Sequence, residues 1–277
     1  MQTNTKPSMA LRLTESAIMI ALATILSLLK LVELPYGGSI TLASMLPILL
    51  IAYRYGTAWG MLTGFVHGAI QLILDPSALS YISGALSIAA TIILDYLLAF
   101  AVIGLGGLFR KWTQRQNAAL LTGAVITGFL RYLCHVIVGC TVWAGLSIPT
   151  AGALAYSFVY NATYMIPETL VVALAAYYVG SAIDFRSGKL AMLKKETSAG
   201  SMRIAHLISG ALICAAAIFD VVSVFSTLQN AETGEFDITG IVNTNWIAVA
   251  AVTGAVILLS IALCAIWRIT AAKKAEN

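Results

Sequence analysis

The sequence predicts an all-α membrane protein, a polytopic helix bundle with a six-helix core and two extra C-terminal transmembrane helices. Three observations support this class. The 277-residue chain is 60% hydrophobic and only 10% charged, whereas soluble domains are about 25% charged. Its mean hydropathy is +0.90, and its apolar residues form runs near the roughly 20 residues that cross a bilayer. Its basic residues gather in short loops between those runs, as cytoplasmic membrane loops do.

Eight apolar segments are candidate spanning helices, in the order residues 10–31, 41–55, 57–74, 82–109, 117–145, 151–182, 203–227 and 245–268. The first is too long for the core of a signal peptide and has no clear cleavage site after it. The second and third are short and joined tightly at residues 53–56, so their boundaries are the least well defined.

The loops between these segments alternate in charge, which predicts orientation. One set contains nearly all the basic residues, for example Arg110 and Lys111. The other set has a single basic residue, Lys30, against the acidic residues Glu33, Asp75, Glu232, Glu235 and Asp237. The positive-inside rule therefore predicts that both termini are cytoplasmic. Because the basic residues lie in loops on one side of the membrane, the net charge of +4 does not indicate binding to nucleic acid. We therefore expect no nucleic-acid partner.

A change in composition predicts how the chain is divided. Residues 184–203 are polar, basic and contain Gly and Ser, which is typical of a linker. We expect a six-helix domain at 1–185, a cytoplasmic linker at 186–202 and a two-helix extension at 203–277. Asp220 is the exceptional polar group of that extension. No internal repeat is visible, which argues against transporter folds built from duplicated units.

Several chemistries find no support in the sequence. The four cysteines all lie in apolar runs without metal-ligand spacing, so neither a zinc site nor a disulfide framework is expected. The chain contains no Walker loop, G-x-S-x-G or HExxH motif. His67, His135 and Asp95 could imitate a metal site, but their spacing gives this no support. We therefore predict no catalytic residues, no cofactor and no metal.

The fifth apolar segment has a stripe of unusual residues at helical spacing. Arg131, His135, Gly139 and Trp143 are four residues apart and share a helix face. Polar groups inside a membrane are candidates for function. Alone, the Trp could be an interface anchor and the His a packing residue. Gly139 between them could leave room for a ligand ring against the helix, which favours a binding site.

The sixth segment adds aromatic and amide groups. Tyr156, Tyr160 and Tyr164 share a face, with Asn161 beside it. The tyrosines could simply pack against neighbouring helices, but the Asn amide has donors and an acceptor that need partners. Pro167 is expected to kink this helix.

Asp95 lies near the middle of the fourth segment, where a carboxylate costs about 3 kcal/mol on insertion scales. It needs a cation, either Arg131 or a positively charged ligand. Tyr96 adjoins it, and a carboxylate with an aromatic face suits an organic cation. For Glu168, in the sixth segment, we favour an internal ion pair with Arg131.

Two stripes of small residues predict close packing. Gly56, Gly60, Gly64 and Gly68 recur every four residues in the third segment, which permits helices to approach closely. Ala17 and Ala21 form a shorter pair of this kind in the first segment, where another membrane protein could dock.

Six blocks of residues together resemble the thiamine-specific substrate-binding subunit, or S component, of energy-coupling factor (ECF) transporters. The blocks are LTESAIMIALATI at 13–25, PYGGSITL at 35–42, LPILLIAYRYG at 46–56, LDYLLAFAVIGLGGLFR at 94–110, RYLCHVIVG at 131–139 and GALAYSFVYN at 152–161. The resemblance covers about residues 10–185 and implies six helices with both ends cytoplasmic. The C-terminal pair of helices has no counterpart, and could be a partner surface or an anchor.

The resemblance also implies the site. Thiamine contacts would come from Asp95, Tyr96, His135, Trp143, Tyr156 and Asn161. A loop around Tyr36 and Gly38 would form a lid, and His67 would be a further contact. Ala17 and Ala21 would dock on a transmembrane coupling subunit, with ATP hydrolysed by two separate ATPase subunits.

Three functions compete at this stage. The first is a thiamine-binding subunit in a bacterial cell membrane that depends on an ECF module, so the chain is not itself an enzyme. The second is a stand-alone proton-coupled transporter of thiamine or a related organic cation, using Asp95, Glu168 or Asp220. The third, a membrane enzyme or assembly factor, is supported only by the stripe that contains His135.

Overall fold

The computed structural model describes residues 8–34, 37–142, 150–188, 190–193, 199–228 and 238–276. The chain forms two compact units, Met1–Leu193 and Lys194–Asn277, and each is described by itself. The elements are α1 (Met9–Leu28), β1 (Lys30–Glu33), β2 (Ser39–Thr41), α2 (Leu46–Tyr55), α3 (Thr57–Leu74), η2 (Ser77–Tyr81), α4 (Ala85–Thr91), η3 (Ile92–Leu98), α5 (Ala99–Ala101), η4 (Val102–Lys111), α6 (Gln116–Ile137), η5 (Val138–Val142), α7 (Ala151–Ala182), β3 (Ile183–Asp184), β4 (Ala191–Met192), α8 (Ala199–Leu228), η6 (Ile238–Asn243) and α9 (Trp246–Glu276).

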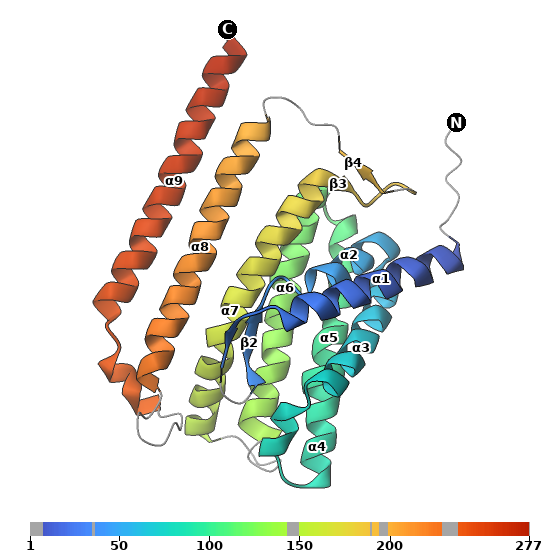
Figure 1. Ribbon diagram of the computed structural model, residues 1–277, viewed down its shortest axis with the longest axis vertical. Coiled ribbons are helices and arrows are strands. Elements are labelled where there is room, and N and C mark those ends of the chain that lie inside the picture. Colours follow the sequence, from blue (N-terminus) through green and yellow to red (C-terminus); the bar gives the residue numbers. More distant parts are fainter. Residues whose placement is uncertain are drawn as a thin grey trace. The chain divides into compact units, whose positions relative to one another are not determined.

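The predicted all-α membrane bundle is confirmed (Figure 1). Within the described residues, seven helical segments are long and apolar enough to cross a membrane. They are Met9–Leu28, Thr57–Leu74, Ala85–Lys111, Gln116–Val142, Ala151–Ala182, Ile204–Leu228 and Trp246–Trp267. The third of these combines α4, η3, α5 and η4, and two turns of π-helix, η3 and η5, interrupt the regular α-helical pattern.

The prediction of a spanning helix over residues 41–55 is wrong. Thr41 ends β2, and α2 has only 10 residues, about 15 Å of helix against a hydrocarbon core of about 30 Å. Ala43 has a left-handed backbone with φ of 56°, and Pro47 lies in the first turn of α2, so the helix begins late. Leu46 through Arg54 are all buried, which makes α2 a core helix of unit 1.

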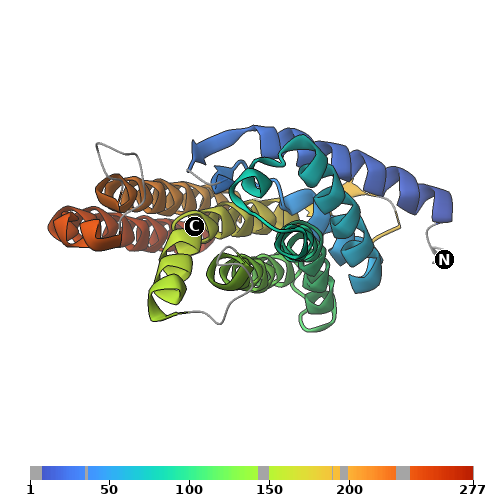
Figure 2. The same ribbon diagram turned by 90° about the horizontal axis from the view of Figure 1, so that it is seen from below.

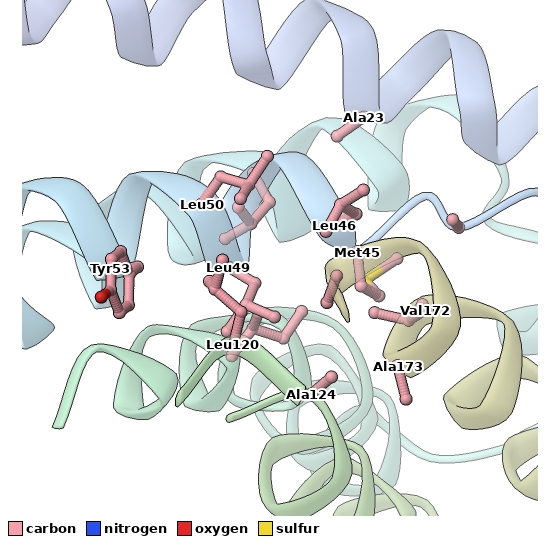
Figure 3. Packing of buried hydrophobic residues seen from close by; sticks show 14 of the residues in the cluster. Ala23, Met45, Leu46, Leu49, Leu50, Tyr53, Leu120, Ala124, Val172 and Ala173 are labelled. Atoms are coloured by element: carbon pink, nitrogen blue, oxygen red, sulfur yellow. The ribbon is translucent and has the colours of Figure 1, made fainter. Parts of the chain in front are cut away.

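The apolar core of unit 1 surrounds α2 (Figure 3). One cluster of buried residues contains Leu46, Leu49 and Leu50 of α2. Its other members include Leu120 and Ala124 of α6, Val172 and Ala173 of α7, and Ala23 of α1. These side chains are nearly inaccessible. The short helix α2 is therefore buried on every face, and the longer helices of unit 1 pack around it.

The glycine stripe of α3 lies against the helix that spans residues 85–111. A Cβ at Gly64 would lie 2.3 Å from the Phe100 carbonyl oxygen, and one at Gly68 would lie 2.5 Å from that of Tyr96. Gly60 likewise faces Ala52 and Gly104. The predicted close packing is therefore confirmed for these three glycines, whereas Gly56 has nothing within 4 Å and ends α2 with φ of 98°.

Helix α1 lies along the edge of unit 1 (Figure 2) and buries little of its surface. Its buried residues are Ser16, Ala23 and Ser27. Ala17 and Ala21 are exposed, so the small-residue pair faces away from the rest of unit 1.

Unit 2 is a hairpin of α8 and α9, which lie side by side (Figure 1). Hydroxyl groups connect α8 to α9 and to the segment just before α9. Thr253 donates to Asp220 at 2.5 Å, and Thr227 pairs with Thr244 at 2.7 Å. These polar contacts stabilise an otherwise apolar hairpin.

Candidate binding site

Unit 1 contains a polar cavity of about 160 Å³, whereas a water molecule needs only roughly 10–15 Å³. Its walls come from the β1–β2 hairpin, the end of α3, η3, α6 and α7. Six residues that the sequence predicted to bind a ligand line it: Gly38, Asp95, Tyr96, His135, Tyr156 and Asn161. The cavity is therefore large enough for a small organic molecule and brings together side chains from distant parts of the chain.

Three other residues were predicted to contact the ligand, namely Tyr36, His67 and Trp143. Tyr36 and Trp143 lie outside the described residues. His67 is fully buried with its ring edge-on to Phe100, at 5.1 Å between centroids. Gln71 lies one helical turn after His67 in α3, and Asp75 follows the last residue of α3. Both of these residues line the cavity. His67 therefore packs against Phe100 and does not line the described cavity, and its contact with a ligand stays a prediction.

Asp95 pairs with His135. The His135 Nδ1 lies 2.8 Å from Asp95 Oδ1, and the side chains are 12% and 17% exposed, respectively. Asp95 lies in the π-helical η3, and His135 lies in the last turn of α6, just before the π-helical η5. Such π turns often mark functional sites. The expectation that either Arg131 or a ligand compensates Asp95 overlooked this third partner.

Arg131 is already paired. Its Nη1 lies 3.2 Å from Glu168 Oε2, which confirms the predicted ion pair. Thr41 of β2 donates to the other Glu168 oxygen at 2.7 Å, and the Arg131 guanidinium lies 4.6 Å from the Phe100 ring centroid. These contacts fix the deep wall of the cavity and leave Asp95 without the arginine.

The tyrosines of α7 form an aromatic ladder along the cavity. Tyr156 and Tyr160 stack at 5.9 Å between centroids, and Tyr160 meets Tyr164 edge-on at 5.8 Å. Tyr160 also accepts a hydrogen bond from the Gly38 backbone N–H at 3.2 Å. The ladder therefore joins the wall of the cavity to the β1–β2 hairpin.

Asn161 is held by its own helix. Its amide donates to the Ser157 carbonyl oxygen at 2.8 Å, and its carbonyl oxygen accepts from the Tyr164 hydroxyl at 2.7 Å. A Cβ on Gly139 would lie 2.4 Å from Ser157 Oγ. Gly139 therefore lets α7 approach η5 closely, and it also lines the cavity. That it leaves room for a ligand ring stays a prediction.

An ion pair joins the hairpin to α3. Lys30 Nζ lies 2.7 Å from Glu33 Oε1 and 3.3 Å from Asp75 Oδ2. The hydrogen bond to Glu33 is the largest influence on Lys30 and raises its pKa. The Ser77 hydroxyl, donating at 2.5 Å, is the main reason that the pKa of Asp75 is lowered. Both groups are therefore charged at neutral pH.

Sequence reasoning missed several residues that line the cavity, among them Lys30, Gln71, Asp75 and Ser157. The positions of Gln71 and Asp75, one and two turns after His67, were the available signal. No cluster of three metal-binding side chains occurs in the part of the chain that the structure describes.

A helix bundle with a cavity lined by polar side chains among apolar spanning helices is an architecture suited to a membrane protein that binds a small polar molecule. Comparison with known sequences then identifies the group. The chain belongs to the thiamine transporter protein family (Thia_YuaJ), whose model matches residues 13–184. The chain is thus a multi-pass membrane protein of a thiamine transporter family.

Individual relatives agree. The chain is 32% identical over 174 residues to the thiamine transporter ThiT of Bacillus subtilis (strain 168), covering 59% of this chain and 86% of the relative. It is 28% identical to ThiT of Lacticaseibacillus paracasei, covering 53% and 75%. A solved structure of ThiT from Listeria monocytogenes superposes with a TM-score of 0.50 and 25% identity, covering 62% of this chain and 93% of that one.

Proposed function

We propose that this protein binds thiamine in the cavity of unit 1 as the first step of its uptake. The observation that carries the proposal is a partly buried carboxylate, Asp95, beside aromatic and hydrogen-bonding groups in one cavity. Thiamine has a permanently cationic thiazolium and a flat aminopyrimidine with donors and acceptors. A carboxylate and aromatic faces suit the first ring, and polar side chains suit the second.

The residues have distinct proposed roles. Asp95 balances the ligand's positive charge, and the tyrosine ladder with Tyr96 provides flat faces. His135 Nε2 is buried without a hydrogen-bond partner among the described residues, so it is available to the ligand. Trp143 and Tyr36 complete the proposed set from outside the described residues.

Isothermal titration of the detergent-purified protein tests this step. We expect thiamine to bind with a dissociation constant below micromolar. Oxythiamine, which has a carbonyl in place of the amino group, should bind more weakly, because the donors and acceptors of its pyrimidine differ. No thiamine binding in the micromolar range would contradict the proposal.

We further propose that transport needs partners, namely a transmembrane coupling subunit and two ATPase subunits of an ECF module. Two features support this. The sequence has no nucleotide-binding motif, so ATP would be hydrolysed elsewhere. Ala17 and Ala21 are exposed on α1, where small residues would let a partner helix approach closely. In this arrangement both termini lie in the cytoplasm of a bacterial cell.

Reconstituted vesicles separate this mechanism from a proton-coupled transporter. Vesicles that contain the protein with the coupling subunit and the ATPases should take up thiamine only with ATP. Vesicles that contain this protein alone should take up none when a pH gradient is imposed. Uptake driven by the gradient alone would favour the stand-alone transporter instead.

A further inference from the structure

The cavity is not electrically balanced by its fixed charges. The charged or readily charged groups that line it are Lys30, Asp75, Asp95, Arg131, His135 and Glu168. Lys30 pairs with Asp75, and Arg131 pairs with Glu168. Two cations therefore stand against three carboxylates, which leaves one negative charge, on Asp95, if His135 is neutral.

Only His135 is placed to balance Asp95 within the described residues. Its Nδ1 is 2.8 Å from the carboxylate, in hydrogen-bond contact. The nearest fixed cation, Arg131, is engaged by Glu168 and lies against Phe100. Because a carboxylate that is largely removed from water is costly without a counter-charge, a proton on the imidazole is the available counter-charge for the 17% exposed Asp95 when no ligand is bound.

This inference rests on the proposed function: we propose that the binding of thiamine displaces a proton from the cavity. His135 carries this proton as an imidazolium when the cavity is empty and releases it to solvent when the cationic ligand binds. The ligand's permanent charge then compensates Asp95, and a second cation in the same cavity would be repelled. The neutral imidazole keeps its Nδ1–H bond to Asp95. Its Nε2, which has no partner among the described residues, becomes an acceptor for a donor of the ligand.

Other groups near His135 do not supply the exchanged proton. Tyr164 of α7 lies 6.0 Å away between ring centroids, and its phenol is neutral at physiological pH. Glu168 and Arg131 form their own pair, and Lys30 and Asp75 form another. Asp95 and Tyr164 contact the imidazole directly. The other titratable or charged groups that the packed elements bring to the same cavity are Tyr96 of η3, Arg131 of α6, and Tyr156, Tyr160 and Glu168 of α7, and Cys134 precedes His135 in α6.

Proton exchange predicts how affinity depends on pH. Where the imidazole of the empty protein is protonated, thiamine must displace the proton, so affinity rises with pH, by at most about tenfold per pH unit for one proton. Once the imidazole is neutral in the empty protein, affinity no longer changes with pH. Affinity is to be measured from about pH 5.5 to about pH 8, the range in which histidine serves as a protonation switch in proteins.

Titration calorimetry of the full-length protein in buffers of different ionisation enthalpy counts the protons directly. We expect release of up to about one proton per thiamine at the acid end of the range, falling at higher pH. A neutral isostere of thiamine, with the thiazolium replaced by an uncharged ring, is the matched control and should bind without release. Asp95→Asn should bind thiamine more weakly, also without release.

The outcomes are separable. Thiamine binding with no proton release anywhere in this range would overturn the exchange while leaving the proposed function intact. Uptake of a proton on thiamine binding would also overturn the exchange, because the complex would then gain a proton that the proposal requires it to lose. Equal release with the neutral isostere would show that the ligand's charge is not the cause. Absence of thiamine binding would instead contradict the proposed function itself.

Discussion

A carboxylate inside a membrane bundle is costly without a compensating charge, and Asp95 is such a group. It is 17% exposed, bonded to His135, and separate from the Arg131–Glu168 pair. A histidine is a weaker counter-charge for a carboxylate than an arginine is, because the imidazole can lose its proton near neutral pH. At the residue scale this makes Asp95 available to a cationic ligand in a way that Glu168 is not.

The first prediction concerns this carboxylate. Asp95→Asn should weaken thiamine binding by roughly 10- to 150-fold, the equivalent of the about 1.5–3 kcal/mol that a hydrogen bond to a charged group contributes. The fold should persist, since the amide can still bond to His135. Titration calorimetry and size-exclusion elution would measure both. Glu33→Gln, an exposed carboxylate on the hairpin, is the control, and equal affinity of the two variants would leave Asp95 with a structural role only.

At the element scale, close packing of α3 against residues 85–111 positions Asp95, because the same helix presents it to the cavity. Gly64→Ala should lower the thermal unfolding midpoint by several degrees, since its Cβ would meet the Phe100 carbonyl oxygen at 2.3 Å and overpacking costs about 1–3 kcal/mol. Gly254→Ala in α9 has nothing within 4 Å and should not lower the midpoint. Thermal unfolding in detergent compares them, and identical midpoints would refute close packing at Gly64.

The β1–β2 hairpin is a second element, fixed to α3 by Lys30 and Asp75. Asp75→Asn should raise the thiamine dissociation rate by up to about 5-fold, as an exposed ion pair contributes about 1 kcal/mol at most. Stopped-flow fluorescence would measure it. Glu33→Gln, which breaks only the contact within the hairpin, should leave the rate unchanged. If both variants dissociate like the parent protein, the pair does not hold the hairpin closed.

The pH dependence of that ion pair has a definite sign. The lowered pKa of Asp75 means that its contribution is lost only as pH falls through a value below the usual one, near 4. The raised pKa of Lys30 means that its contribution is lost only as pH rises above 10.5. The dissociation rate should therefore lack a Lys30–Asp75 titration between about pH 5 and about pH 9. A titration there that Asp75→Asn abolishes would contradict this assignment.

The exposed pair on α1 belongs to the same scale. Ala17→Trp or Ala21→Trp should leave thiamine affinity unchanged but abolish ATP-dependent uptake, because a bulky ring would hold a partner helix away. Val125→Trp, at a 45% exposed position on α6, is the control and should transport normally. Uptake assays in vesicles with the partner subunits give the answer. Normal transport by both Ala17→Trp and Ala21→Trp would show that this face of α1 is not the docking surface.

At the scale of the whole molecule, the cavity belongs entirely to unit 1. Every described residue that lines it lies before Leu193, and the family match ends at residue 184. A chain that ends at Leu193 should therefore bind thiamine with the affinity of the full chain, measured by the same titration. Loss of affinity in a truncated protein that elutes as a monodisperse species would assign residues 194–277 a part in binding.

Hydropathy and the placement of basic residues were enough to predict the class of this protein, because both are local properties that the bilayer selects directly. The sequence also identified several of the polar groups that line the cavity, since a carboxylate, imidazole or amide in an apolar run stands out without coordinates. Only the tertiary structure decided which of them meet. The rotation of α3 carries His67 behind Phe100, the π turns frame Asp95 and His135, and the shortness of α2 follows from backbone geometry around Ala43. Such pairings depend on helix rotation and on contacts between distant segments, which periodicity along the chain does not specify.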